Sequence, residues 1–202
     1  IDASLKEIAY AYDTLKADGI GLITSYEDRY LGDAVFAPVW EELNRRNAVV
    51  YTHPSWPACC SKMRDELNVS TVEYATDTTR TIGSIVLSGT AARYPNIRWI
   101  FSHGGGALIG VASRVVGTVT EKDLSGTPAV NSRLHHIRRF FYDTAGSANP
   151  VLMQGIAKLA GASQIVFGTD YPFGGGQNLA EGLKLVGFNE QQLRGIDREN
   201  AL

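Results

Sequence analysis

The chain has 202 residues, of which 44% are hydrophobic and 20% are charged, and its formal net charge is −2. This composition is typical of a globular domain with enough apolar side chains for a sizeable core. No excess of lysine and arginine is available to neutralise phosphates, which argues against nucleic acid and anionic membranes as partners. A small polar or anionic metabolite stays open as a ligand.

The two cysteines, Cys59 and Cys60, are adjacent in the sequence. Adjacent cysteines rarely form a structural disulfide and cannot link distant parts of a fold, so we interpret them as reduced thiols. No apolar run reaches the roughly 18 residues of a membrane-spanning helix, and the N-terminal residues lack the pattern of a signal peptide. We therefore predict a cytoplasmic protein.

Helical and strand-like patterns alternate along the whole chain, without a break in composition that would mark a domain boundary. In chain order, the patterns predict a helix that ends at Asp18-Gly19, a strand over 20–24, a helix over 34–46, a strand over 48–52, a helix over 73–93, a strand over 97–101, helices over 107–116 and 134–139, a strand over 140–143, a helix over 150–160 and a strand over 165–167.

Short apolar strands that are each followed by a helix predict an α/β fold, in which helices cover both faces of a parallel sheet. We expect one domain over residues 1–202. A closed (β/α)₈ barrel needs eight strands and typically about 250 residues. The strands of this sequence therefore indicate either an open doubly wound sheet or a barrel without its first three units.

Three side chains that can bind metal or transfer protons, His53, His103 and Asp170, each follow the C-terminal end of a predicted strand. Active sites of α/β proteins form at this edge of the sheet. Each residue also has a structural interpretation. His53 can hydrogen-bond a loop carbonyl, Asp170 can cap a helix, and His103, with three glycines after it, is the hardest to explain without a ligand.

Four segments, in this order and at these intervals, resemble the amidohydrolase-related (amidohydrolase 2) family, which includes aminocarboxymuconate semialdehyde decarboxylase, resorcylate decarboxylase and fungal methylsalicylate decarboxylase. They are Tyr51-Thr52-His53-Pro54, Ile100-Phe101-Ser102-His103-Gly104-Gly105-Gly106, Phe141-Tyr142-Asp143-Thr144-Ala145 and Phe167-Gly168-Thr169-Asp170-Tyr171-Pro172-Phe173. The resemblance implies a TIM-type barrel of which this chain contributes strands four to eight.

The resemblance also implies roles for individual residues. His53 and Asp170 would be metal ligands, and His103 would activate a water molecule at the metal or transfer a proton. Imidazole and carboxylate ligands suit zinc, which we favour, or manganese. Family members carry further ligands on the first strand, and the matching residue pair is absent from this sequence. We therefore expect that the chain is part of a longer protein.

Three more residues are candidates for substrate binding. Arg114 matches an arginine that binds the substrate carboxylate in the family's decarboxylases, often in the neighbouring subunit, which implies a homodimer. Trp56 and Tyr171 follow the proposed ligands closely enough to stack on an aromatic substrate. A surface position for Arg114 and ordinary packing for the two aromatic residues are the alternatives.

The resemblance implies a metal-dependent, non-oxidative decarboxylase of a small carboxylic acid, of the hydroxybenzoate or salicylate type or another unsaturated acid, with His103 or Asp170 handling the proton. The same residues could instead hydrolyse a lactone, amide or ester by general-base catalysis. A third class of function is a non-catalytic piece that only associates with other subunits. Carbon dioxide release without uptake of water distinguishes the first reaction from the second.

Overall fold

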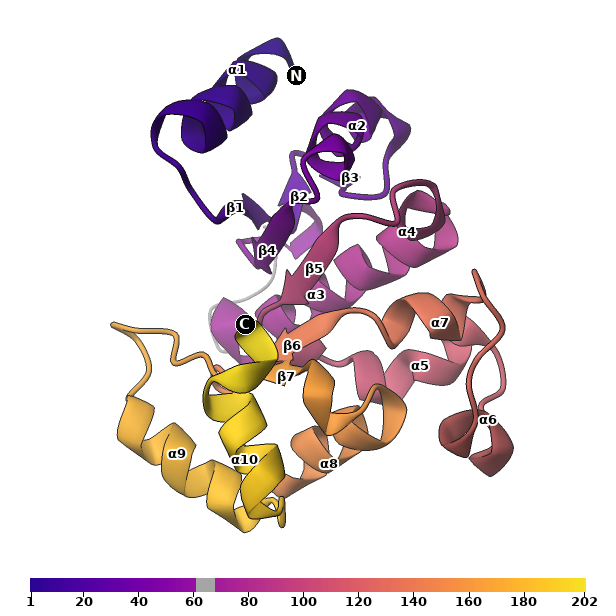
Figure 1. Ribbon diagram of the computed structural model, residues 1–202, viewed down its shortest axis with the longest axis vertical. Coiled ribbons are helices and arrows are strands. Elements are labelled where there is room, and N and C mark those ends of the chain that lie inside the picture. The colour runs from indigo at the N-terminus through magenta and orange to yellow at the C-terminus, as the bar shows by residue number, and fades with distance from the viewer. Residues whose placement is uncertain (61–67) are drawn as a thin grey trace. The chain divides into compact units, whose positions relative to one another are not determined.

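The structure is a computed structural model that describes residues 1–60 and 68–202 (Figure 1). The chain divides into two compact units, residues 1–100 (unit 1) and residues 101–202 (unit 2). Among the described helices, none combines the length and the apolar character that a membrane span requires.

Unit 1 begins with two adjacent helices and then alternates strands with helices. Its elements are α1 (Asp2–Ala9), the π-helical η1 (Tyr10–Thr14), β1 (Gly19–Ile23), β2 (Ser25–Tyr26), β3 (Arg29–Tyr30), η2 (Ala34–Phe36), α2 (Ala37–Arg45), β4 (Val49–His53), η3 (Ala58–Cys60), α3 (Val69–Leu87), α4 (Thr90–Arg93) and β5 (Arg98–Phe101), whose last residue falls in unit 2.

The strand that carries His53 runs parallel to β1. The two strands pair from Gly19 opposite Val49 to Ile23 opposite His53, so both end at the same edge. On the other side of β4 lies β5, where the backbone N–H of Arg98 donates to the carbonyl of Ala48 at 2.9 Å. This arrangement places His53 at the C-terminal edge of a parallel pair, as the sequence predicts.

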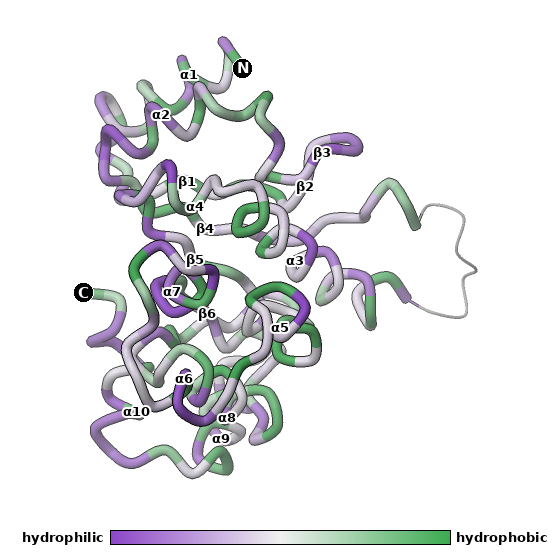
Figure 2. The backbone as a smooth tube through the Cα atoms, turned by 90° about the vertical axis from the view of Figure 1, so that its right-hand side faces the viewer, coloured by the Kyte–Doolittle hydropathy of each residue, from purple (hydrophilic) through white to green (hydrophobic). Residues whose placement is uncertain are grey.

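The core of unit 1 lies where α2 packs on the strands. Trp40 of α2 and Trp99 of β5 are each 1% exposed. Their rings pack edge to face, with their centroids 5.2 Å apart. α1 lies beside α2 (Figures 1 and 2), and the hairpin of β2 and β3 carries a hydrophilic turn, purple in Figure 2. A cavity of about 760 Å³, lined largely by apolar residues of α1, β1 and α2, adjoins this core.

The predicted helix over 73–93 is wrong in its extent. α3 begins earlier, at Val69, because the side chain of Asn68 caps it by accepting a hydrogen bond from the N–H of Ser70 at 3.0 Å. It ends at Leu87, since Gly89 adopts a left-handed conformation with φ of +77° and separates α3 from α4.

Both cysteines are free thiols. The Sγ atoms of Cys59 and Cys60 lie 3.1 Å apart, and the Cys60 thiol donates to Oε2 of Glu73 at 3.0 Å. The hydrogen bond to the Glu73 carboxylate, followed by that to Cys59 and by burial, raises the pKa of Cys60 to about 12. Cys60 therefore stays protonated at neutral pH and is a poor nucleophile.

Unit 2 consists of short strands that alternate with helices (Figure 1). Its elements are η4 (His103–Gly105), α5 (Leu108–Val116), α6 (Glu121–Ser125), α7 (Arg133–Ile137), β6 (Phe141–Asp143), α8 (Pro150–Leu159), η5 (Ala162–Gln164), β7 (Ile165–Val166), α9 (Gly176–Leu185), α10 (Glu190–Asp197) and η6 (Glu199–Ala201).

The strands β6 and β7 are parallel, with Tyr142 opposite Ile165 and Asp143 opposite Val166. The helix between them, α8, begins with Pro150 at its first position, and the side chain of Asn149 caps it by accepting from the N–H of Leu152. Asp143 and the residues after β7 therefore lie at one C-terminal edge of unit 2.

The alternation of parallel strands with helices confirms the predicted α/β fold. Each predicted strand is present, and its bounds move by at most one residue. The hairpin of β2 and β3 and the helices α6, α9 and α10 were not predicted. Each hairpin strand has only two residues, too few to show a repeating pattern of apolar side chains.

Candidate functional site

His103 stands in a sharp turn directly after β5. Its backbone has φ of +56°, in the left-handed region that few residues other than glycine adopt, and Gly104, Gly105 and Gly106 after it also have positive φ. The N–H of His103 donates to Oδ1 of Asp143 at 2.7 Å. Strained backbone of this kind is concentrated at functional sites, where surrounding contacts enforce it.

A hydrogen bond determines the tautomer of the neutral His103 ring. Its Nδ1 lies 3.1 Å from the carbonyl oxygen of Ala145, which can only accept a hydrogen bond, so Nδ1 carries the proton and donates it. In the neutral ring, the lone pair is therefore on Nε2. A histidine held through Nδ1 in this way presents Nε2 to a metal ion or to a proton in transfer.

Asp143 holds this turn in place. Its side chain is 3% exposed, and its Oδ1 accepts hydrogen bonds from the N–H groups of His103 and of Ala145, the latter at 3.1 Å. Asp143 belongs to one of the four segments that resemble the family, but the sequence predicts no role for it. The sequence does contain one indication of such a role. Asp143 is an acidic residue at the end of an apolar strand, and a buried charge needs hydrogen-bond partners.

Asp170 is presented by a second strained turn, after β7. Its φ is +59°, and its carbonyl oxygen accepts hydrogen bonds from Phe173 at 2.8 Å and Gly174 at 2.9 Å. The structural alternative, a helix cap, does not hold, because α9 begins at Gly176 with Gly175 as its N-cap. The role of Asp170 is therefore not explained by a helix cap.

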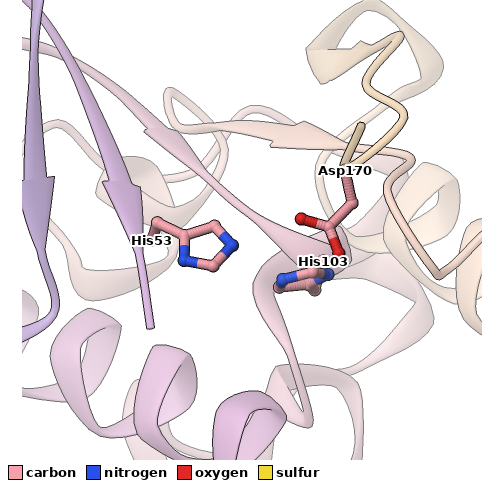
Figure 3. Close-up of side chains that lie close together, drawn as sticks. All are labelled: His53, His103 and Asp170. Carbon is pink, nitrogen blue, oxygen red and sulfur yellow. The ribbon is translucent and has the colours of Figure 1, made fainter. Parts of the chain in front are cut away.

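Unit 2 brings His103 and Asp170 together. A ring nitrogen of His103 and a carboxylate oxygen of Asp170 lie within 4.8 Å of one another, and both side chains are partly buried. Figure 3 shows the carboxylate of Asp170 directed toward the ring of His103. An imidazole nitrogen and a carboxylate oxygen are ligands that suit zinc and manganese, so this pair fits a divalent metal ion.

His53, in unit 1, is held in the same manner as His103. Its Nδ1 lies 2.8 Å from the carbonyl oxygen of Pro54, so Nδ1 donates and Nε2 carries the lone pair of the neutral ring. The ring of Tyr74 on α3 packs edge to face against the His53 ring at 6.4 Å. The hydrogen bond from His53 to a loop carbonyl, which the sequence offered as a structural role, is thus present. The same bond fixes the tautomer in which Nε2 can act as a metal ligand.

The three residues predicted to bind substrate lie at the surface of their units. Trp56 is 57% exposed and Tyr171 is 85% exposed. Arg114 lies on α5 and is also exposed. Their assignment to substrate binding stays a prediction.

We expect that replacing Gly104 by alanine lowers the free energy of unfolding by about 1–3 kcal/mol, because a side chain in the left-handed region is strained. A Cβ atom at Gly104, whose φ is +59°, would lie 3.0 Å from atoms of Leu152 and Met153 on α8. Denaturant unfolding measures the change.

Gly110→Ala is the matched control for this substitution, since Gly110 lies inside α5 and a Cβ there meets no atom within 4 Å. The control should leave stability unchanged or raise it, by up to about 1 kcal/mol. Equal effects of the two substitutions would contradict a strained glycine turn.

Residues 1–202 match the model of the family described as "Amidohydrolase". The chain is 37% identical over 98% of its length to Decarboxylase macB of Penicillium terrestre, covering 61% of that protein. It is 35% identical over 84% of its length to 6-methylsalicylic acid decarboxylase of Penicillium expansum, covering 53% of it. The chain therefore spans a little over half the length of these curated relatives.

A solved structure of a dihydroxybenzoic acid decarboxylase from Polaromonas sp. JS666, with bound manganese and the inhibitor 2-nitroresorcinol, has a TM-score of 0.81 to this structure. The two are 21% identical, and the match covers 97% of this chain and 63% of the other. This likeness and the family match confirm the predicted fold class, α/β as part of a TIM-type barrel.

Proposed function

Because the chain belongs to the amidohydrolase family, we propose that it forms the metal-binding part of a non-oxidative decarboxylase of a small aromatic hydroxy acid. The observation that carries this proposal is the pair of His103 and Asp170, presented by strained turns at the C-terminal edge of parallel strands. The decarboxylases among its relatives support the proposed reaction. One of them, 6-methylsalicylic acid decarboxylase, supports the proposed class of substrate.

We propose that His53 joins this pair, so that Nε2 of His53 and the carboxylate of Asp170 bind the metal ion. The hydrogen bond from Nδ1 of His53 to Pro54 supports this assignment, because it places the lone pair of the neutral ring on Nε2, the nitrogen that can bind a metal ion. Manganese is supported by the solved decarboxylase that contains it, and zinc is the alternative that the same ligand types allow. The bound ion would polarise the carboxylate and a neighbouring oxygen of the substrate.

His103 is proposed as the proton donor. When its ring is fully protonated, Nδ1–H stays bound to the carbonyl of Ala145, and Nε2–H is the proton that would move to the substrate. The Nε2 proton adds to the ring carbon that bears the carboxylate. The bond to the carboxylate then breaks, its electron pair returns to the aromatic ring, and carbon dioxide leaves. His103 is left neutral and regains a proton from solvent.

The remaining assignments are also proposals. Arg114 would bind the substrate carboxylate from a neighbouring subunit of a homodimer, where its guanidinium can donate two parallel hydrogen bonds. Trp56 and Tyr171 would stack on the aromatic ring, and their exposure leaves their faces open to a ligand. A cytoplasmic location stays a prediction.

Product analysis in isotopically labelled water tests the reaction. With manganese and 6-methylsalicylic acid or 2,6-dihydroxybenzoic acid, we expect one carbon dioxide per phenol formed. In deuterium oxide, one deuterium should appear at the ring carbon that lost the carboxylate. Incorporation of ¹⁸O from water into the organic product would show hydrolysis instead. Absence of turnover by the manganese-loaded protein with both acids would contradict the proposed substrate class.

A further inference from the structure

One face of α3 is buried although it is polar. Glu73, Asp77 and Thr81 lie at successive turns of this helix, and their exposed fractions are 9%, 0% and 0%. Carboxylates are almost never buried to this extent unless they are paired, because removing their charge from water is costly. An apolar helix face could be buried here without the desolvation free energy that these carboxylates require. The hydrogen-bond partners of this face are therefore of interest.

Asp77 is the most deeply buried carboxylate on this face. It accepts hydrogen bonds from the hydroxyl of Thr24 and from the hydroxyl of Tyr30, the latter at 2.6 Å, and Nη1 of Arg80 lies 3.9 Å away. Burial, together with the hydrogen bond to Asp77, raises the pKa of Tyr30, so its hydroxyl remains a donor at neutral pH. The buried carboxylate is therefore fully engaged, and one of its two donors is Thr24.

The hydroxyl, the carbonyl oxygen and the N–H of Thr24 each make a hydrogen bond. Its hydroxyl donates to Asp77, and its carbonyl oxygen accepts from the hydroxyl of Thr81 at 2.7 Å. Its N–H donates to the carbonyl oxygen of His53 at 3.1 Å. Thr24 is 0% exposed and follows directly on β1, whose last residue pairs with His53. The buried polar face of α3 is thus connected to the backbone of His53 through one residue.

We propose that Asp77 and Thr24 are positioning residues that fix the backbone of His53 for metal binding. Pro54 and Tyr74 orient the ring, and Thr24 fixes the peptide from which the side chain projects. Both kinds of contact are needed, because a ligand atom is placed by its backbone as well as by its ring angle. Groups that support a ligand in this way typically change metal affinity by about 10- to 100-fold when they are removed. This inference rests on the proposed metal-binding role of His53.

The test measures the affinity for Mn²⁺ alone by titration calorimetry, on variants whose folding is checked by circular dichroism. Thr24→Val removes the hydroxyl and keeps the shape of the side chain, and Asp77→Asn removes the charge. Each is expected to weaken Mn²⁺ binding about 10- to 100-fold. Thr24→Ser keeps the hydroxyl and should stay within about twofold of the unaltered protein. The variant pair keeps the test valid if one of the two fails to fold.

Thr78→Val is the matched control. Thr78 is also a fully buried threonine of α3, and among the described residues its hydroxyl has no hydrogen-bond partner. Its replacement should leave Mn²⁺ affinity unchanged. If Thr24→Val and Asp77→Asn fold and bind Mn²⁺ like Thr78→Val, the network is only structural and the inference is overturned.

His53→Ala separates this inference from the proposed function. If it weakens Mn²⁺ binding while Thr24→Val does not, only the positioning role fails. If His53→Ala itself leaves the affinity unchanged, the proposed ligand set fails. Electron spin-echo spectroscopy of bound Mn²⁺ provides a second readout, because coupling to the ¹⁴N of His53 should change in Thr24→Val and persist in Thr24→Ser.

Discussion

Replacing Asp170 by asparagine is expected to abolish stoichiometric manganese binding and to lower kcat by about 10³-fold, which corresponds to about 4 kcal/mol of transition-state stabilisation. The amide is nearly the same size as the carboxylate, but it carries no charge to attract a divalent cation. The loss should therefore reflect ligand chemistry, since the turn that presents Asp170 is held by its backbone carbonyl oxygen, which the substitution leaves in place.

Elemental analysis after gel filtration, combined with steady-state kinetics, checks this expectation. Asp197→Asn is the control, because Asp197 is an exposed aspartate at the end of α10 and should tolerate the same change. Manganese retained at full stoichiometry in Asp170→Asn would refute the ligand assignment. Metal lost from both variants would point to a general effect of charge.

His103→Asn should lower kcat by about 10²- to 10⁴-fold, the range typical of a lost general acid, while manganese remains bound. Asparagine is the suitable replacement because it adopts the left-handed conformation of His103, with φ of +56°, more readily than alanine does. Added imidazole should partly restore the rate, since it can supply the missing proton donor.

The distinction between proton donor and ligand depends on two measurements made together. Loss of manganese along with activity would make His103 a ligand, which its distance to Asp170 permits, and would move proton transfer to another group. A rate that stays high with metal bound would exclude both roles. His135→Ala, on α7, tests whether any histidine replacement has these effects.

The position of the candidate residues at strand ends could be predicted because the relevant signal is local. A short apolar strand followed by a histidine or an aspartate is visible in consecutive residues, and the C-terminal ends of parallel strands share one edge. His103 and Asp170 meet within unit 2 for this reason. The alternative of a helix cap at Asp170 could not be excluded in advance, because the start of α9 is weakly marked by glycines.

The supporting residues could not be predicted, because their roles depend on contacts between distant segments. Asp143 binds the N–H of His103, 40 positions earlier in the chain, and Asp77 binds Thr24, 53 positions earlier. The threonine-rich stretch 76–81 has low helix propensity, yet two of its residues, Asp77 and Thr81, are buried and hydrogen-bond Thr24 of another segment. Helix propensity describes how much such residues destabilise an isolated helix. It does not identify the distant hydrogen-bond partners that offset this destabilisation in the folded protein.

Both histidines are oriented by main-chain oxygens, those of Pro54 and Ala145. Every amino acid supplies such an oxygen, so these two hydrogen bonds are set by the path of the chain and do not require a particular side chain at positions 54 and 145. For protein engineering, this separates two tasks. Side chains that face the substrate can be varied in a library to change selectivity, while the nitrogen that each histidine presents stays the same.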